Sequence, residues 1–252
     1  MKKILLSALL LLIAGVQTAV AQKMIVTLDD DSKVEYNITK VKDVTFVEAE
    51  PEEQHEWVDL GLPSGTLWAT CNIGANNPEE YGDYFAWGET EPKNEYSWGT
   101  YKYCNGSSDT LTKYCYDSSY GINAFADTLI VLLPKDDAAT VNWGNGWQMP
   151  NLTQIQELCN SSYTTTEWTT QNGVRGRLVK SNSNGNSIFL PAAGYLGVTS
   201  LKYLGLNGYY WSRSLSTNYA TNAYYLYFYS GYIGLLDDGR CYGQSVRPVR
   251  KQ

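Results

Sequence analysis

The segment that most constrains the fold runs from Ala223 to Tyr229 and reads AYYLYFY. In an extended strand, alternate side chains lie on opposite faces of the sheet. One face would carry Tyr225, Tyr227 and Tyr229, and the other Tyr224, Leu226 and Phe228. Because both sets are aromatic or apolar, both faces must be at least partly covered, and we expect this strand to be central in its sheet. We expect residues 232–236 to pair with it through a turn at Ser230-Gly231.

Other short β segments are predicted along the chain. Asn172-Gly173 separates residues 167–170 from residues 174–180, and this dipeptide favours a tight hairpin because both residues tolerate positive φ. A second turn at 182–186 leads to a strand at 187–190. Further strands are expected at 65–70 and 81–87, whereas residues 91–142 have no regular pattern and are expected to form loops.

One helix has a clear start signal. Asn151 can cap its first turn, and Gln154 stands three residues later, as a capping box requires. Leu152, Ile155 and Leu158 then share one face at helical spacing. The pattern predicts a helix over about residues 152–160 that packs its apolar face on the core.

The chain divides into segments of different character. Residues 1–21 read MKKILLSALLLLIAGVQTAVA, with a charged start, an apolar run and a small-x-small site, which indicates a secretory signal peptide cleaved after Ala21. The alternative is a membrane anchor, but the apolar run is shorter than the roughly 20 residues that a span needs. Since no later stretch is as apolar, the mature chain should have no transmembrane segment and should be secreted, periplasmic or at the cell surface.

The mature chain is expected to hold two folded parts. Residues 22–47 alternate around an acidic turn and predict a β-hairpin with one further short strand, a module too small to bury much. Residues 48–56 are acidic and predict a solvated linker, which contains His55, the only histidine. The main domain would span residues 57–250, with its end segments 57–60 and 245–250 side by side.

Six strings in this domain resemble one known family, the Fibrobacter succinogenes major paralogous domain family of secreted bacterial proteins, abundant in gut Bacteroidetes. The strings are Trp57–Thr70 (WVDLGLPSGTLWAT), Tyr81–Glu89 (YGDYFAWGE), Gly146–Pro150 (GWQMP), Phe189–Gly194 (FLPAAG), Tyr210–Ser212 (YWS) and Ser245–Arg250 (SVRPVR). The third and last strings also resemble the C-type-lectin-like fold. The resemblance implies an α+β domain with short strands, at least one short helix, long loops and paired terminal strands. It implies no settled activity.

Catalytic chemistry has little support in the sequence. His55 stands in the acidic linker, and the chain has no HExxH motif, phosphate-binding loop or CxxC pair. Adjacent acidic residues at 79–80, 136–137 and 237–238 are interpreted as turn or surface residues. Because glycoside hydrolysis uses a pair of carboxylates, a carbohydrate hydrolase is the rival function. No cofactor is expected. A structural Ca²⁺ at the Asp237-Asp238 turn stays open, because carboxylates are its preferred ligands.

The cysteines are five in number, so they cannot all pair. Cys104 and Cys115 stand in near-copies, KYC, on either side of a turn-like loop. A hairpin through that loop would place them opposite each other, within reach of a disulfide. We therefore predict a Cys104–Cys115 disulfide in an oxidising compartment, with two reduced thiols as the alternative. Cys159 lies on the apolar face of the predicted helix and is interpreted as a core thiol.

Charge and aromatic content restrict the partners. The chain has a net charge of −7, which argues against a nucleic-acid partner, because phosphate neutralisation needs clustered Lys and Arg. Aromatic residues make up 13% of the chain, and Tyr and Trp rings both stack on sugars and anchor protein interfaces. Most of the aromatic residues near the C-terminus should be core. The remainder predict a polar and aromatic ligand surface made of Tyr209, Trp211, Arg213, Asp237, Asp238 and Arg240.

The sequence therefore predicts a secreted or surface-exposed, non-catalytic binding or adhesion module. Its partner would be a glycan or a cell-surface protein. The alternatives are an extracellular carbohydrate-active hydrolase and a purely structural surface protein.

Overall fold

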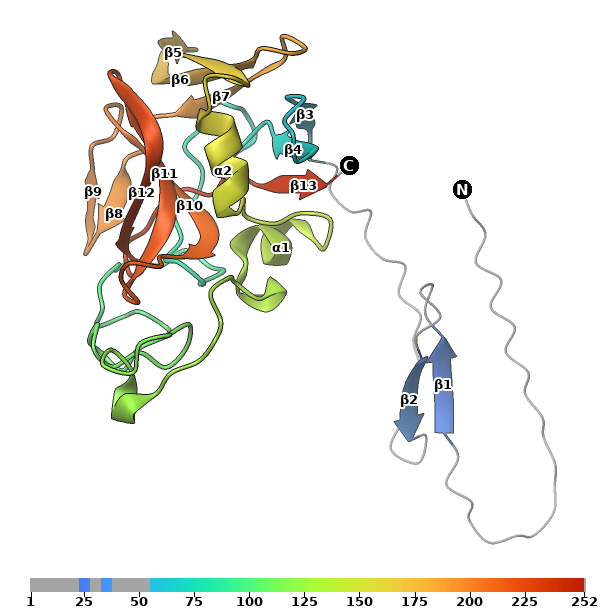
Figure 1. Cartoon of the computed structure of the whole chain (residues 1–252), viewed down its shortest axis with the longest axis vertical. Coiled ribbons are helices and arrows are strands. Elements are labelled where there is room, and N and C mark those ends of the chain that lie inside the picture. Colours follow the sequence, from blue (N-terminus) through green and yellow to red (C-terminus); the bar gives the residue numbers. More distant parts are fainter. Residues whose placement is uncertain (1–22, 28–32, 38–54, 252) are drawn as a thin grey trace, which may run out of the picture. The chain divides into compact units, whose positions relative to one another are not determined.

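A computed structural model describes residues 23–27, 33–37 and 55–251 of the chain (Figure 1). The chain forms two compact units, Met1–Glu50 and Pro51–Gln252. The predicted signal peptide, the expected third strand near 41–47 and the acidic residues 48–54 lie outside the described residues.

The first unit contains the predicted β-hairpin. Strands β1 (Lys23–Thr27) and β2 (Lys33–Asn37) are antiparallel, with Lys23 opposite Asn37. An exposed ion pair joins Lys23 Nζ to Glu35 Oε2 at 2.7 Å. The side chains of β2 are all exposed, so this hairpin has little buried surface of its own.

The second unit is built mainly from short strands with few helices, in agreement with the expected α+β class. Strands β10 (Gly208–Leu215), β11 (Asn222–Tyr229) and β12 (Tyr232–Gly239) form one sheet with β11 in the centre, which confirms the prediction for residues 223–229. β5 (Thr164–Gln171), β6 (Val174–Ser181) and β7 (Ser187–Pro191) form a second sheet. β8 (Tyr195–Gly197) and β9 (Ser200–Lys202) form a small hairpin.

The terminal segments of this unit share a third sheet. β3 (Trp57–Asp59) and β13 (Val249–Lys251) both pair with β4 (Thr66–Ala69), in the order β13-β4-β3. The two end segments were expected to lie side by side. They do belong to one sheet, but β3 and β13 are not neighbours in it, because β4 lies between them (Figure 1).

Residues 81–87 do not form the predicted strand. Their only ladder contact among the described residues is a single bridge between Phe85 and Gln244. Gly82 and Gly88 have φ values of 68° and 82°, in the left-handed region, and they interrupt an extended chain at both ends of the segment. Phe85 and Trp87 are nevertheless buried. The apolar side chains of this segment therefore pack in the core although the segment is not a strand of a sheet.

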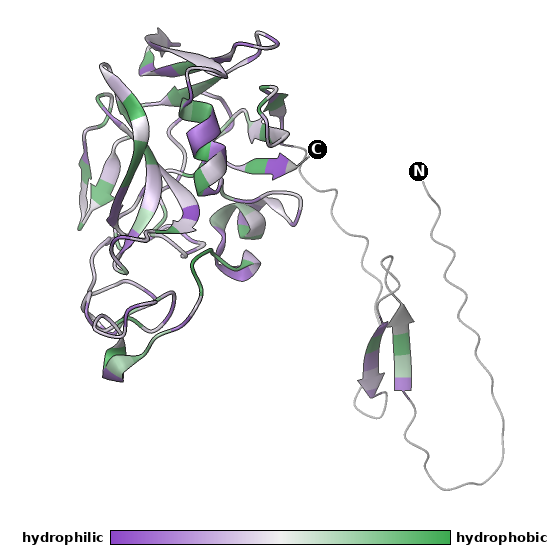
Figure 2. Ribbon diagram, in the orientation of Figure 1, coloured by the Kyte–Doolittle hydropathy of each residue, from purple (hydrophilic) through white to green (hydrophobic). Residues whose placement is uncertain are grey.

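The helices are short. α1 (Ala138–Trp143) was not expected, whereas α2 (Leu152–Cys159) confirms the predicted helix and its capping box. Asn151 Oδ1 accepts from Gln154 N, and Gln154 Oε1 accepts from Asn151 N. α2 packs against β10 and β12, and hydrophobic and hydrophilic residues alternate along it in Figure 2. Two 3₁₀ turns complete the unit, η2 (Ile122–Ala124) and η3 (Pro134–Asp136).

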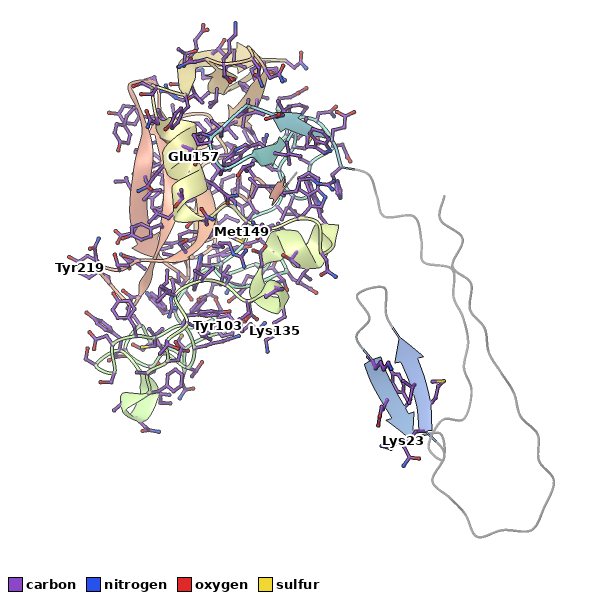
Figure 3. All side chains as sticks on the ribbon, turned by 45° about the vertical axis from the view of Figure 1, so that its right-hand side comes forward. Lys23, Tyr103, Lys135, Met149, Glu157 and Tyr219 are labelled. Carbon is purple, nitrogen blue, oxygen red and sulfur yellow. The ribbon has the colours of Figure 1, made fainter. Side chains whose placement is uncertain are left out.

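Polar contacts tie α2 to the start of the domain. Glu157, labelled in Figure 3, accepts hydrogen bonds from the backbone and hydroxyl of Ser64. Gln154 Nε2 donates to Thr66 Oγ1 of β4 at 2.8 Å, where both groups are buried. The capping glutamine therefore both starts the helix and fixes it to the sheet that contains the chain ends.

The two faces of β11 lie in different cores, as the alternation predicts. Tyr225 belongs to the larger core with Trp87 and Trp211. Leu226 and Phe228 belong to a second core that also contains the buried residues of α2. The strand thus separates the two cores and contributes to both.

Three buried arginines hold irregular segments through backbone carbonyls. Arg247 donates to the carbonyls of Ala69, Thr70 and Phe189, and to Asn72 Oδ1. This guanidinium joins the end of β4 to β7. In the same way, Arg177 donates to the carbonyls of Tyr229, Ser230 and Tyr232 at the β11–β12 turn, and Arg240 donates to Tyr114 O.

The long irregular segment has its own polar centre at Asp136. The Asp136 carboxylate is buried and accepts hydrogen bonds from Tyr103, Tyr114 and Lys113, which also forms an ion pair with it. Tyr103 is labelled in this loop region in Figure 3. Burial alone would raise the pKa of Asp136, but the bonds from Lys113 and the two tyrosines outweigh it, and the pKa is lowered.

The capping box predicts a measurable stability difference. Asn151→Ala removes the acceptor for Gln154 N, and we expect the free energy of unfolding to fall by about 1 kcal/mol. Urea denaturation followed by circular dichroism measures it. The exposed Asn218→Ala is the matched control and should leave stability unchanged, and equal effects of the two substitutions would contradict the assignment.

The Asp136 centre predicts a pH-dependent difference. Asp136→Asn leaves the Lys113 charge without its counterion, so we expect a loss of about 3 kcal/mol near neutral pH. Because the folded-state pKa is below the usual 3.8, this stabilisation is present above pH 3.8 and is lost as the pH falls through the folded-state pKa. Denaturation curves across this range test it, with the exposed Asp109→Asn as control. A difference that does not shrink in acid would refute the assignment.

Candidate functional site

The predicted ligand residues do not form one surface. Trp211 is fully buried, and its Nε1 donates to Phe85 O at 2.8 Å. Its assignment to a ligand surface is wrong, because the segment at 85–87 covers this side of β10. Arg240 is also fully buried, with its Cζ 5.6 Å from the Trp87 ring and 5.5 Å from the Tyr101 ring, so it too cannot face a ligand.

Asp237 and Asp238 lie in strand β12 and not in the expected turn. Adjacent residues of a strand point to opposite faces, so the two carboxylates cannot both bind one ion there. Asp237 accepts a hydrogen bond from Ser216 Oγ. Asp238 lies near Tyr225 on the other face, and burial raises its pKa.

Tyr209 belongs to a surface that we call the tyrosine face, and Asp238 lies beside it on the same side of the sheet, near Tyr225. The tyrosine face consists of the rings on one side of the β10–β12 sheet together with rings from neighbouring loops. Its members are Tyr195, Tyr203, Tyr209, Tyr225, Tyr227, Tyr229, Tyr232 and Tyr242. Each ring contacts at least one other, with Tyr209 and Tyr195 at 4.9 Å between centroids and Tyr229 and Tyr232 at 6.1 Å.

Exposure changes across the tyrosine face. Tyr209 and Tyr225 are 7% and 5% exposed and form its base. Tyr203, Tyr229 and Tyr232 are 52%, 41% and 41% exposed. Tyr203 contacts Tyr209 directly, whereas Tyr229 and Tyr232 contact the half-buried Tyr227, which in turn contacts Tyr209 and Tyr225. These ring contacts order the outer rings before any ligand arrives.

Two details fix individual rings of this face. Asn207 Nδ2 donates to the Tyr227 hydroxyl at 2.6 Å. Gly234 lies opposite Tyr227, and a Cβ there would come within 2.2 Å of the Tyr232 hydroxyl, so a larger residue would displace that ring from its present orientation. The sequence showed the alternation of tyrosines on β11, but not that residues from β8 and the following loops complete the surface.

The predicted Cys104–Cys115 disulfide is not formed. The loop between them turns within itself through Asn105 N and Thr110 O, so Cys104 lies opposite Leu111 and not opposite Cys115. Both thiols are free and face backbone carbonyls, Cys104 that of Trp98 and Cys115 that of Asp117. Their pKa values are raised by burial, which disfavours the reactive thiolate.

The helix cysteine packs as expected. Cys159 lies against the core that contains Ile155 and Leu158, and burial raises its pKa to about 12. Burial likewise raises the pKa of Cys241 to about 12. Neither thiol is suited to act as a nucleophile near neutral pH.

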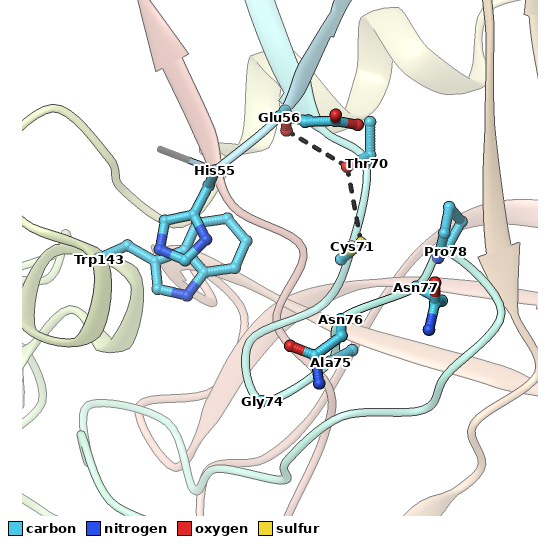
Figure 4. Close-up of a pocket in the computed structure, with 10 residues that line it drawn as sticks. All are labelled: His55, Glu56, Thr70, Cys71, Gly74, Ala75, Asn76, Asn77, Pro78 and Trp143. Carbon is cyan, nitrogen blue, oxygen red and sulfur yellow. Dashed lines mark hydrogen bonds between the residues drawn. The ribbon is translucent and has the colours of Figure 1, made fainter. Parts of the chain in front are cut away.

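His55 is not the solvated linker residue that the sequence predicted. Its ring stacks on Trp143 of α1, with centroids 3.6 Å apart and an angle of 11° between the planes. Together they line a cavity of about 610 Å³ with Thr70, Cys71 and the loop of residues 74–78 (Figure 4). The sequence did not indicate Trp143 as the stacking partner of His55, because Trp143 belongs to α1, a helix that the sequence pattern did not predict.

Polar groups that line this cavity contact one another. Thr70 Oγ1 donates to Glu56 O at 3.4 Å and lies 3.6 Å from Cys71 Sγ (Figure 4). One face of the His55 ring is covered by Trp143, and this stack forms part of the cavity wall.

No family model, curated protein or solved structure matches this chain. Within the described residues, the helices are too short and too polar to cross a lipid bilayer.

The His55 stack predicts a spectroscopic link between the two rings. A stacked ring shifts the NMR resonances of its partner through the ring current. The Trp143 indole N–H resonance, identified with Trp143→Phe, should therefore move in His55→Ala. Glu56→Gln, in the same cavity, should leave this resonance in place. An indole resonance at the same position in wild type and His55→Ala would exclude the stack in solution.

Proposed function

We propose that this chain is a secreted or surface-exposed, non-catalytic module that binds a glycan through the tyrosine face, with a protein surface as the second class of partner. The supporting observation is the set of exposed rings at Tyr203, Tyr229 and Tyr232, of which the first contacts the buried Tyr209 and the other two contact the half-buried Tyr227. Flat aromatic faces contact the C–H surface of sugar rings, and their hydroxyls offer hydrogen bonds beside it.

The turn that carries two of these rings is rigidly held. Arg177 donates to the carbonyls of Tyr229 and Tyr232, and Tyr229 also stands directly opposite Tyr232 in the β11–β12 register. A ligand that stacks on this pair would order few additional groups, which reduces the entropic cost of binding. Asn207 and Asp238 supply neighbouring polar groups that could select among sugars.

We further propose a C-type-lectin-like arrangement and membership of the Fibrobacter major paralogous domain family. The shared sheet of β3, β4 and β13 supports this arrangement, because it brings both ends of the domain together. Secretion rests on the signal-peptide pattern of residues 1–21.

The rival functions give different experimental results. A carbohydrate hydrolase would release labelled fragments from a polysaccharide, whereas a binding module would retain the polysaccharide intact. A purely structural surface protein would do neither. Incubation of residues 22–252 with labelled polysaccharides, followed by separation of bound and released material, distinguishes the three.

The tyrosine face predicts a specific loss of binding. Tyr229→Ala and Tyr232→Ala each remove one exposed ring, and we expect each to weaken binding of a glycan identified on an array by roughly tenfold, which corresponds to about 1.4 kcal/mol and lies at the upper end of aromatic stacking energies. Isothermal titration measures the affinity. Tyr219→Ala is the matched control, because Tyr219 is 56% exposed outside the tyrosine face and is labelled in Figure 3.

Unchanged affinity in both folded variants would exclude the tyrosine face as the binding surface. Binding of host proteins by the wild type, lost in the same variants and without any glycan signal, would select the protein partner.

A further inference from the structure

A second cavity, of about 580 Å³, lies where η3, α1, β10 and β13 meet. The volume is within the range of small-ligand sites. It is lined by Pro134, Thr140, Asn145, Gly146, Trp147, Gln148, Arg213 and Arg250. Two arginines and no carboxylate thus appear among its described lining residues, in a chain with a net charge of −7.

Arg250 is the less satisfied of the two arginines. Its Cζ lies 5.4 Å from the centre of the Trp147 ring, and its buried Nε has no hydrogen-bond partner. Across the described ranges 23–27, 33–37 and 55–251, no carboxylate approaches it within 4.0 Å. Arg177, Arg240 and Arg247 each donate to backbone carbonyls of neighbouring segments, and the remaining nitrogens Arg177 Nε, Arg240 Nε and Arg240 Nη2 have no hydrogen-bond partner among the described residues. Arg250 differs from these three because its guanidinium donates to no carbonyl of the described segments.

Contacts with neighbouring groups fix the position of the Arg213 guanidinium. Its guanidinium donates to Gln148 Oε1 and to Leu132 O, and its Nε lies 3.7 Å from Asp137 Oδ2. Asp137 is fully buried, and its carboxylate accepts from the backbone N–H groups of Met149 and of the first turn of α1. Asp137 therefore offsets part of the Arg213 charge, whereas no carboxylate of the described residues forms an ion pair with Arg250.

Neutral polar groups complete the cavity. Asn145 is exposed at its rim, and Gln148 accepts from Arg213 through Oε1, which leaves its amide nitrogen to donate. Guanidinium groups bind carboxylates through paired hydrogen bonds, and amides suit hydroxyl groups. A ligand with one carboxylate surrounded by hydroxyls satisfies this combination better than an aliphatic acidic side chain.

We propose that this cavity binds the carboxylate of an acidic sugar, a uronic acid unit, with Arg250 and Arg213 as the charge partners. The proposal rests on the proposed glycan-binding function and names a ligand class for a second site. The carboxylate would occupy the space beside the two guanidiniums, and the sugar hydroxyls would face Asn145 and Gln148.

The experiment uses residues 22–252 and trigalacturonic acid as the probe in isothermal titration. We expect saturable binding that weakens by roughly tenfold or more for the methyl-esterified trisaccharide, which has the same rings without the charge. Arg250→Gln should cause a similar loss, with the thermal midpoint checked to confirm folding. Arg175→Gln, which removes an exposed arginine of β6 outside the cavity, is the matched control and should bind as the wild type does.

A second variant keeps both arginines in place. Asn145→Asp adds a negative charge at an exposed position on the rim and should weaken binding of the acid by a larger factor than binding of the ester, because charge repulsion acts on the acid alone whereas a lost hydroxyl contact acts on both. Equal affinity for acid and ester, full binding by Arg250→Gln, or no binding of the acid overturns the proposal. A tetraglutamate peptide that binds as tightly as the trisaccharide also overturns it, in favour of an acidic protein partner.

The two proposals can fail separately. If a neutral glycan binds and is lost in Tyr229→Ala, while trigalacturonic acid does not bind, the tyrosine face stands and the acidic cavity is rejected. If no glycan of either kind binds, both are rejected.

Discussion

Buried guanidinium groups provide the hydrogen bonds on which the rest of this domain depends. Its strands are short and its loops are long, so many backbone carbonyls lie outside any sheet or helix and still need donors once they are buried. An arginine has five N–H donors and can satisfy several carbonyls at once. Arg247 does this for Ala69, Thr70 and Phe189, which belong to segments far apart in the sequence. A charge inside the core is tolerated here because carbonyl dipoles surround it.

Hydrogen bonds from a buried arginine to backbone carbonyls also determine the shape of the tyrosine face. Arg177 fixes the backbone of the β11–β12 turn, and the half-buried ring of Tyr227 connects the exposed rings of that turn to the buried rings of Tyr209 and Tyr225. β11 can perform this role because its opposite face is anchored independently by Leu226 and Phe228 in the second core. The aromatic content that looked excessive in the sequence is therefore distributed over two cores and one accessible surface.

Local signals in the sequence were reliable where a few neighbouring residues determine the conformation. Asn172-Gly173 forms the predicted turn with φ values of 49° and 84°, and Asn151 and Gln154 form the predicted capping box. The alternation in β11 gave the correct faces for its side chains. These features need no knowledge of the remainder of the chain, because each depends on contacts within about a turn of structure.

The errors have a common physical origin in long-range contacts. Trp211 was predicted to belong to a ligand surface as one of the aromatic residues left over from the core, whereas its ring packs in the larger core and donates to Phe85, which is distant in the sequence. His55 was assigned to solvent because its acidic neighbours in the linker are typical of exposed segments, whereas its partner Trp143 is distant in the sequence. Cys104 and Cys115 were paired on local symmetry, which the turn within the loop breaks.

The net charge of the chain does not decide what its cavities can bind. At physiological ionic strength the Debye length is about 8 Å, so charges elsewhere on the surface are largely screened from a ligand inside a pocket. What such a ligand experiences is set by the groups within a few ångströms, where burial weakens screening. In the cavity at Trp147 these groups are Arg250, Arg213 and the Asp137 carboxylate behind it. An acidic protein can therefore contain a local site for anions, and the stacking of Arg250 on Trp147 keeps that charge at the cavity wall and limits its retreat into solvent.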